Sequence, residues 1–259
     1  MPEEKEPHYF ATDMPVYRRM TSEKEYLALF DEANSAQQAI GEASVWYLFS
    51  RTAIPSIMRF NADAKFLVFF RNPVEFVQSL HAQFAYNNGR DPDFPAAWES
   101  AEMQARLVAY GSFGEQFSRL RAIVPKNQYL VIVQDDMKIS PRTEYLRALE
   151  FLGLRDDGRT EFVNFNARKV HRSPYLARFT TRTPQALARA WQLTKRVTGI
   201  KRLGLMDRIH TLNTKRQRKT PISPELRQSV RDTFAGEIAS LGEQLGDRKS
   251  TRLNSSHYS

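Results

Sequence analysis

Two short apolar runs stand out against the polar background of the chain. KFLVFF (65–70) and YLVIV (129–133) are nearly continuous stretches of β-branched, aromatic and leucine residues. Such runs are typical of strands buried on both faces of a parallel sheet. Between and around them, apolar residues recur at helical spacing. The pattern predicts an α/β fold, a parallel sheet flanked by helices.

The helix after the first strand has a clear start signal. In RNPVEF, Asn72 suits the N-cap, Pro73 the first helical position and Glu75 the third. Further patterns predict the following elements: a helix over 22–39 with Tyr26, Leu27, Leu29 and Phe30 inward, a short strand entering a loop within 40–49, a long helix over 96–122 broken at 111–114, a loop over 135–140, a helix from Ser140-Pro141 to Gly153, and a helix over 223–245.

Composition narrows the function classes. The 259 residues are 41% hydrophobic and 26% charged and contain no cysteine, so disulfides, thiol catalysis and thiolate metal sites are excluded. The five histidines show no metal-ligand spacing, and we expect no metal. No apolar run approaches the ~20 residues that span a bilayer. We expect a cytoplasmic protein, or one that is peripheral to a membrane.

Positive charge is concentrated in one segment. Residues 168–219 hold fifteen Lys and Arg and one acidic residue, a net charge of +14, whereas the whole chain carries +9. This basic segment, which we expect to be helical, favours an anionic partner. The alternative is an ordinary solvated helical face.

Arg71 is a candidate anion-binding residue. It follows the first apolar strand, and ligands of parallel sheets bind beyond the carboxyl ends of the strands. The next helix would point its free N–H groups to the same place, and Ser79 would lie on the same helical face. The alternative is that Arg71 pairs with Glu75 or a nearby carbonyl.

Four motifs in order then carry a resemblance. They are KEPHYF (5–10), GEASVWYL (41–48), RNPVEFVQS (71–79) and the segment NQYLVIVQDDMKISPRTEYLRALEFLGL (127–154). Together they resemble the sulfotransferases that use 3′-phosphoadenosine 5′-phosphosulfate (PAPS), of the heparan-sulfate-type and bacterial carbohydrate kinds. The resemblance implies transfer of a sulfuryl group from PAPS to a hydroxyl of a carbohydrate or glycolipid, without a metal. The charge of the basic segment adds the expectation of an anionic acceptor.

The resemblance also implies roles for individual residues. Glu6 would be the general base, with His8 and Lys5 beside it, and Arg71 and Ser79 would hold the 3′-phosphate of the cofactor. Ser44 would line the cofactor site, and Lys169 and Arg172 would belong to a basic loop that closes on the nucleotide. Two positions depart from the family pattern: Phe76 stands where relatives often have Arg, and Asp135 where Glu is usual.

Both ends of the sequence are unusual for this family. The family places a strand and a phosphate-binding loop with Lys and Ser/Thr before the KEPHYF segment, and this sequence contains no such loop. We therefore expect residues 1–246 to be a P-loop-type sulfotransferase domain that lacks its first strand and phosphate-binding loop, and to be inactive or weak. DRKSTRLNSSH (247–257) resembles a sequencing adapter translated in frame, so we expect 247–259 to be a non-native tail.

Two other functions stay open from the residues alone. The basic segment, with Tyr175, Phe179 and Trp191, would suit a binding module for nucleic acid or an anionic membrane surface. A kinase-like transferase could use Asp135 and Asp136 to hold Mg²⁺, but it would leave KEPHYF unexplained. On the sulfotransferase reading we expect no nucleic-acid partner.

Overall fold

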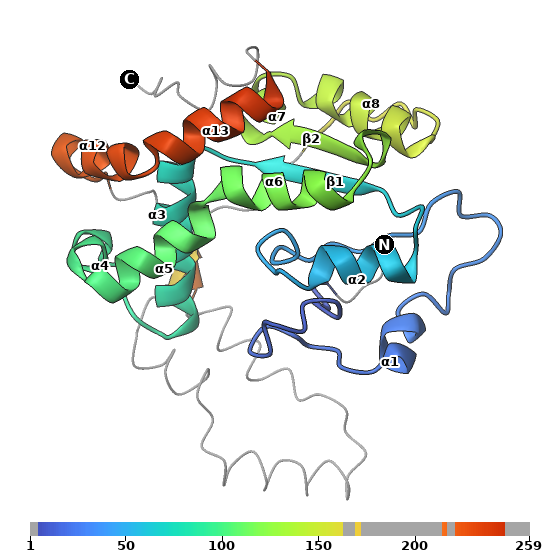
Figure 1. Cartoon of the computed structure of the whole chain (residues 1–259), viewed down its shortest axis with the longest axis horizontal. Helices are drawn as coiled ribbons and strands as arrows, with labels where there is room; N and C mark the ends of the chain where they lie inside the picture. Colours follow the sequence, from blue (N-terminus) through green and yellow to red (C-terminus); the bar gives the residue numbers. More distant parts are fainter. Residues whose placement is uncertain (1–4, 163–168, 172–213, 217–220, 247–259) are drawn as a thin grey trace, which may run out of the picture. The chain divides into compact units, whose positions relative to one another are not determined.

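The computed structural model describes residues 5–162, 169–171, 214–216 and 221–246 (Figure 1). Its contacts divide the chain into two units. The first comprises residues Met1–Pro73, Tyr110–Phe162 and Thr233–Ser259, and the second Val74–Ala109 and Val163–Asp232. Each unit is described by itself.

The predicted parallel strands form the centre of the first unit. Strands β1 (Phe66–Phe70) and β2 (Tyr129–Val133) pair in parallel, from Phe66 opposite Tyr129 to Phe70 opposite Val133. The expectation that β1 is buried on both faces is wrong. Val68 and Phe70 are buried, whereas Leu67 is 37% and Phe69 55% exposed, so β1 alternates between a core face and an open face.

Helix α6 (Phe113–Ile123) covers the core face of β1. The Phe70 ring lies 5.5 Å from that of Phe113 and 5.4 Å from that of Phe117. Helix α13 (Ala235–Leu245) runs beside α6 (Figure 1) and buries Ile238 and Leu241. These aromatic and aliphatic contacts form the core against which β1 packs.

The remaining elements of the first unit are short. They are α1 (Glu23–Ala28), α2 (Ala53–Phe60), the 3₁₀ turn η1 (Lys126–Gln128), α7 (Gln134–Ile139) and α8 (Pro141–Leu152). As predicted, α8 follows Ser140 and ends at Gly153, whose φ of 76° is left-handed. Residues 135–140, predicted as a loop, belong instead mostly to α7, which an ion pair of 2.7 Å between Asp135 and Lys138 supports.

The predicted helix over 22–39 is mostly wrong. Only α1 forms, with a capping box between Ser22 and Glu25, and the chain then continues in turns. Tyr26 is buried as expected, but Leu27 is 45% exposed. The strand predicted within 40–49 does not form either. This stretch is irregular and ends in turns.

The second unit contains most of α3 (Pro73–Asn87), α4 (Phe94–Glu99), most of α5 (Ala101–Gly111) and α12 (Pro224–Thr233). The predicted helix over 96–122 is thus divided between α4, α5 and α6, with the expected break at Ser112 and another at Ser100. The predicted helix over 223–245 is divided into α12 and α13 at Phe234.

Two described stretches of the basic segment are strands, not helices. Strand β3 (Lys169–His171) pairs antiparallel with β4 (Thr214–Arg216). The rest of this segment lies outside the described residues. Among the helices that the structure describes, none is long and apolar enough to cross a membrane.

Candidate functional site

Glu6 and His8 have unusual backbone conformations. Their φ angles are 57° and 49°, and they are the only non-glycine residues of the described chain with positive φ. Left-handed backbone at a residue with a side chain costs about 1–3 kcal/mol and is concentrated at functional sites. The strained conformation therefore points to the same two residues that the KEPHYF motif does.

The strained segment is held by the segment that contains Ser44. The Glu6 amide donates to the Ala43 carbonyl at 3.1 Å, and the His8 amide donates to Ser44 Oγ at 3.1 Å. These contacts are made across more than thirty intervening residues. Glu6, His8 and Ser44, three of the predicted site residues, are thereby brought together.

Glu6 and His8 also meet through their side chains. Glu6 Oε2 lies 3.6 Å from His8 Nε2, with the Glu6 side chain 42% exposed and that of His8 only 3%. The polar contact with His8 and the nearby charges of His8 and Arg19 lower the pKa of Glu6 below its ordinary value, although partial burial opposes them. Glu6 is thus an accessible, ionised carboxylate with a buried imidazole behind it.

Glu42 is a second carboxyl group in this cluster. Ser44 Oγ donates to Glu42 Oε2 at 2.9 Å. Burial raises the pKa of Glu42, while hydrogen bonds from Tyr47 and Ser44 and the charge of His8 act in the opposite direction. Burial also raises the pKa of Tyr47, whose hydroxyl accepts a hydrogen bond from the Phe10 amide at 3.4 Å.

Sequence reasoning gave Glu42 and Tyr47 no role. A signal for Glu42 was present, since it stands two residues before Ser44 and alternate residues of an extended segment lie on the same side. Nothing in the local sequence indicates that Tyr47 contacts Phe10, because that contact joins positions 37 residues apart.

The other predicted residues are more dispersed. Lys5 is exposed, and its carbonyl accepts a hydrogen bond from Arg19 Nη1 at 3.3 Å. Arg71 is half-buried and follows the last residue of β1, as predicted. Ser79 is exposed on α3 and belongs to the second unit, whereas Glu6 belongs to the first.

The predicted basic loop is only partly described. Lys169 begins β3, where it stands opposite Arg216, and Arg172 lies outside the described residues. The acidic pair after β2 lies within α7, where Asp136 is buried. The described residues contain no group of three His, Cys, Asp or Glu that could hold a metal ion.

Comparison with known proteins identifies the family. Residues 47–190, more than half of the chain, match the family model described as the sulfotransferase domain. This chain belongs to the sulfotransferase domain family. Arg71, Ser79, Lys169 and Arg172 fall within the matched span of this sulfotransferase, whereas Glu6, His8 and Ser44 precede it. No curated protein matches the chain.

A solved structure supports the fold of this sulfotransferase. A sulfotransferase from Alicyclobacillus acidocaldarius matches with a TM-score of 0.63 at 21% sequence identity, covering 94% of this chain and 83% of that one. The predicted α/β sulfotransferase fold is confirmed. Family membership supports sulfuryl transfer as the general activity of an enzyme that needs a sulfuryl donor and a hydroxyl-bearing acceptor.

Proposed function

We propose that this sulfotransferase transfers a sulfuryl group from PAPS to a hydroxyl group of a carbohydrate or glycolipid, with Glu6 as the general base. The observation that carries the proposal is the Glu6–His8 pair, held on left-handed backbone with the carboxylate accessible and the imidazole buried. Strain of this kind persists only where surrounding contacts impose it, and here two hydrogen bonds to the 43–44 segment do so.

Glu6 suits the role of proton acceptor. A hydroxyl is a poor nucleophile until its proton has somewhere to go, and a positioned carboxylate can take it. The lowered pKa of Glu6 keeps the carboxylate ionised at neutral pH, ready to accept a proton. The buried His8 ring fixes where that carboxylate points, because its Nε2 lies 3.6 Å from Glu6 Oε2.

Arg71 fits the phosphate of a nucleotide donor. It follows β1 directly and precedes Pro73, the first residue of α3, so a guanidinium group and the positive end of a helix dipole are adjacent in the chain. PAPS would supply the sulfuryl group and leave as 3′-phosphoadenosine 5′-phosphate (PAP). We propose that Arg71 and Ser79 hold its 3′-phosphate and that Lys169 and Arg172 close on the nucleotide.

Ser44 is a weaker member of the proposed cofactor site. Its hydroxyl proton is already donated to Glu42, and its oxygen accepts the His8 amide. A hydroxyl has one proton to give, so Ser44 can donate to a phosphate only by breaking its bond to Glu42. Its contribution to PAPS binding is therefore expected to be small. Lys5, exposed next to Glu6, is proposed to add positive charge near the transferred group.

A binding module is the second candidate function. The basic segment carries a net charge of +14, and in β3 and β4 Lys169 stands opposite Arg216 and Val170 opposite Lys215. Clustered basic residues attract nucleic acid or an anionic membrane surface, with an affinity that falls steeply as salt rises. Within the enzyme proposal the same charge favours an acidic or already sulfated acceptor.

The deciding experiment is an activity assay on the whole chain. The protein is incubated with PAPS and paired neutral and sulfated oligosaccharides, and PAP release and acceptor mass are measured. We expect weak turnover in the whole chain, and a further fall of up to about 10²- to 10⁴-fold in Glu6→Gln with PAP affinity retained. The exposed Glu32→Gln serves as a control of equal charge change and should behave as wild type.

Three outcomes would contradict the proposal in different ways. Wild-type turnover in Glu6→Gln would remove Glu6 from the role of base. Turnover with neutral acceptors alone would remove the anionic acceptor. Salt-sensitive binding to DNA or anionic vesicles, without binding of PAP, would place the binding module ahead of the enzyme.

A further inference from the structure

A directional chain of hydrogen bonds starts at Glu42 and ends at the strained segment. Ser44 Oγ donates to Glu42 Oε2 at 2.9 Å and accepts from the His8 amide at 3.1 Å. Because a hydroxyl carries one proton, Glu42 decides which way that proton points. A lone pair of Ser44 is then left to face the His8 amide. Glu42 thereby orients the hydroxyl group whose oxygen accepts the His8 amide, in the contact that holds His8 in its left-handed conformation.

Tyr47 links Glu42 to the same segment a second time. Its hydroxyl accepts the Phe10 amide at 3.4 Å, and its ring meets the His8 ring edge to face at a centroid distance of 6.2 Å. Hydrogen bonding with Tyr47 is one of the interactions that Glu42 makes, and the charge of His8 also acts on the Glu42 carboxylate. Backbone and ring of His8 are thus both connected to Glu42.

Burial of the Glu42 carboxyl group lowers the stability of the folded protein. Its Oε1 is buried and accepts no hydrogen bond from the groups that the structure describes. A buried carboxylate oxygen without a partner destabilises a protein, and a neutral side chain of the same shape would avoid much of that penalty. A carboxyl group retained at such a position is better explained by the site than by stability.

We propose that Glu42 is a positioning residue of the site, which acts through Ser44, Tyr47 and His8 to hold the Glu6 carboxylate in its working position. The inference deepens the proposed function and rests on it. Charged and titratable groups around the cluster include Glu6, His8, Tyr9, Tyr26, Tyr47 and, next to Glu6, Lys5 and Arg19. Glu42 reaches the backbone of His8 through Ser44, and it interacts with Tyr47, whose ring contacts the His8 ring.

A positioning role and a structural role predict opposite effects of Glu42→Gln on stability. Burial raises the folded pKa of Glu42 above its ordinary 4.5, so its favourable contribution is complete below that pH and is lost as pH rises through the folded pKa. That contribution is therefore smaller at pH 7 than at pH 4, because burial disfavours the ionised form of Glu42. Glutamine keeps an oxygen to accept from Ser44 but carries no charge. We expect Glu42→Gln to unfold at higher urea than wild type at pH 7, and to lose that advantage at pH 4.

The same variant is expected to lower turnover. Without the Glu42 charge the His8 ring is less firmly held, and small displacements of a catalytic group reduce rates strongly. We expect kcat to fall about 10- to 100-fold with PAP affinity unchanged. Glu25→Gln is the matched control, because Glu25 also contacts a serine, Ser22, but in the capping box of α1. It should not raise stability or lower kcat.

A second pair of variants tests the chain of hydrogen bonds. Ser44→Thr keeps a hydroxyl, whereas Ser44→Ala removes it. We expect Ser44→Ala to lose about as much kcat as Glu42→Gln and Ser44→Thr to restore most of it. Equal activity of Ser44→Ala and Ser44→Thr would overturn the directional chain of hydrogen bonds. Wild-type kcat in Glu42→Gln, or a loss of stability in that variant at pH 7, would overturn the positioning role.

One measurement separates this inference from the proposed function. Carbon-13 NMR of the glutamate carboxyl groups follows the titration of Glu42 in wild type and in His8→Gln, with no substrate present. The attraction of His8 lowers the pKa of Glu42, so we expect the titration of Glu42 to move to higher pH in His8→Gln. An unchanged titration refutes the link between Glu42 and His8. If that link is present and wild type shows no turnover with PAPS, the proposed function fails and not the geometry.

Discussion

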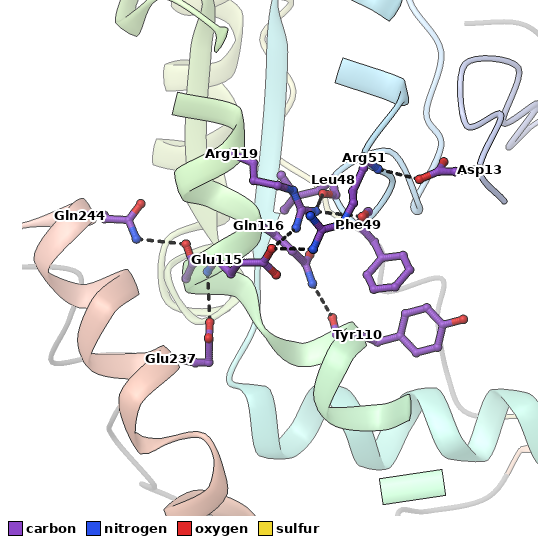
Figure 2. Close-up of polar contacts among 11 residues, drawn as sticks. Asp13, Leu48, Phe49, Arg51, Tyr110, Glu115, Gln116, Arg119, Glu237 and Gln244 are labelled. Atoms are coloured by element: carbon purple, nitrogen blue, oxygen red, sulfur yellow. Dashed lines mark hydrogen bonds and ion pairs between the residues drawn. The ribbon is translucent and has the colours of Figure 1, made fainter. Parts of the chain in front are cut away.

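Helices α6 and α13 approach each other closely at Gly114. A Cβ atom at this position would lie 2.9 Å from both the backbone oxygen and Oε2 of Glu237, and 3.2 Å from Cβ of Ser240. Two hydrogen bonds join the helices here (Figure 2): the Glu115 amide donates to Glu237 Oε2 at 3.1 Å, and Gln244 Nε2 donates to the Gly114 carbonyl at 3.1 Å. The substitution Gly114→Ala should therefore push the helices apart.

The expected loss of stability follows from three contributions. Alanine gains at most about 1 kcal/mol of helix propensity over glycine. Overpacking against a backbone oxygen costs about 1–3 kcal/mol, because that atom cannot rotate away. Weakening the two hydrogen bonds costs about 1 kcal/mol each. We expect a net loss of about 2–4 kcal/mol, which lowers the urea midpoint by about 1–2 M for an m-value of about 2 kcal/mol/M.

Urea unfolding followed by circular dichroism measures this shift, and α13 itself supplies the control. Gly236 directly precedes Glu237 on the facing helix, and a Cβ atom there meets nothing within 4 Å. Gly236→Ala should be neutral or stabilising by up to about 1 kcal/mol. If Gly114→Ala unfolds at or above the wild-type midpoint, α6 and α13 do not approach as closely as Figure 2 shows.

Three further predictions concern single side chains. Arg119 donates to two backbone carbonyls of the 48–49 segment at 3.2 and 2.9 Å, so Arg119→Ala should lower the free energy of unfolding by about 1–3 kcal/mol, while Arg51→Ala, at a side chain 72% exposed, should change it by under about 1 kcal/mol. Burial acts to raise the pKa of Asp13, but hydrogen bonds from neighbouring hydroxyl and amide groups outweigh it and lower that pKa. The stabilising contribution of Asp13 is therefore lost as pH falls below 3.8, and Asp13→Asn should flatten the acid limb of a stability–pH curve. Calorimetry should show about a tenfold or greater loss of PAP affinity in Arg71→Ala, and Arg71→Lys should recover only part of it.

The parts of the fold that sequence reasoning predicted correctly have strong local signals. Apolar runs gave both parallel strands, Pro73 gave the start of α3, and the glycines of 111–114 gave the break before α6. The failures lie where tertiary contacts override local pattern. The apolar periodicity of 22–39 resembles a helix, but Tyr26 is drawn into a ring cluster with Tyr9, Phe10 and Phe60, and the helix ends at Ala28.

The site was predictable only in part, for a similar reason. Family motifs pointed to Glu6 and His8, but no local rule marks a glutamate or a histidine for left-handed backbone. Glu42 acquires its role from contacts with positions more than thirty residues away, through Ser44. Such a role depends on which segments lie side by side, and that information is not contained in the spacing of residues along either segment.

The free-energy cost of the backbone strain at the site is similar to the stabilisation that the aromatic cluster beside it provides. Two left-handed residues cost about 1–3 kcal/mol each. Phe10, two residues after His8, is buried and makes ring contacts with Tyr9, Tyr26, Tyr47 and Phe60 at 4.8, 5.0, 6.0 and 5.4 Å. Such pairs contribute about 0.5–1.5 kcal/mol each beyond the burial of their area. The ring contacts of Phe10 can therefore offset the strain at Glu6 and His8. This offset accounts for an aromatic residue at the end of the strained segment. It also allows the Glu6 carboxylate to stay accessible while His8 and Phe10 beside it are buried.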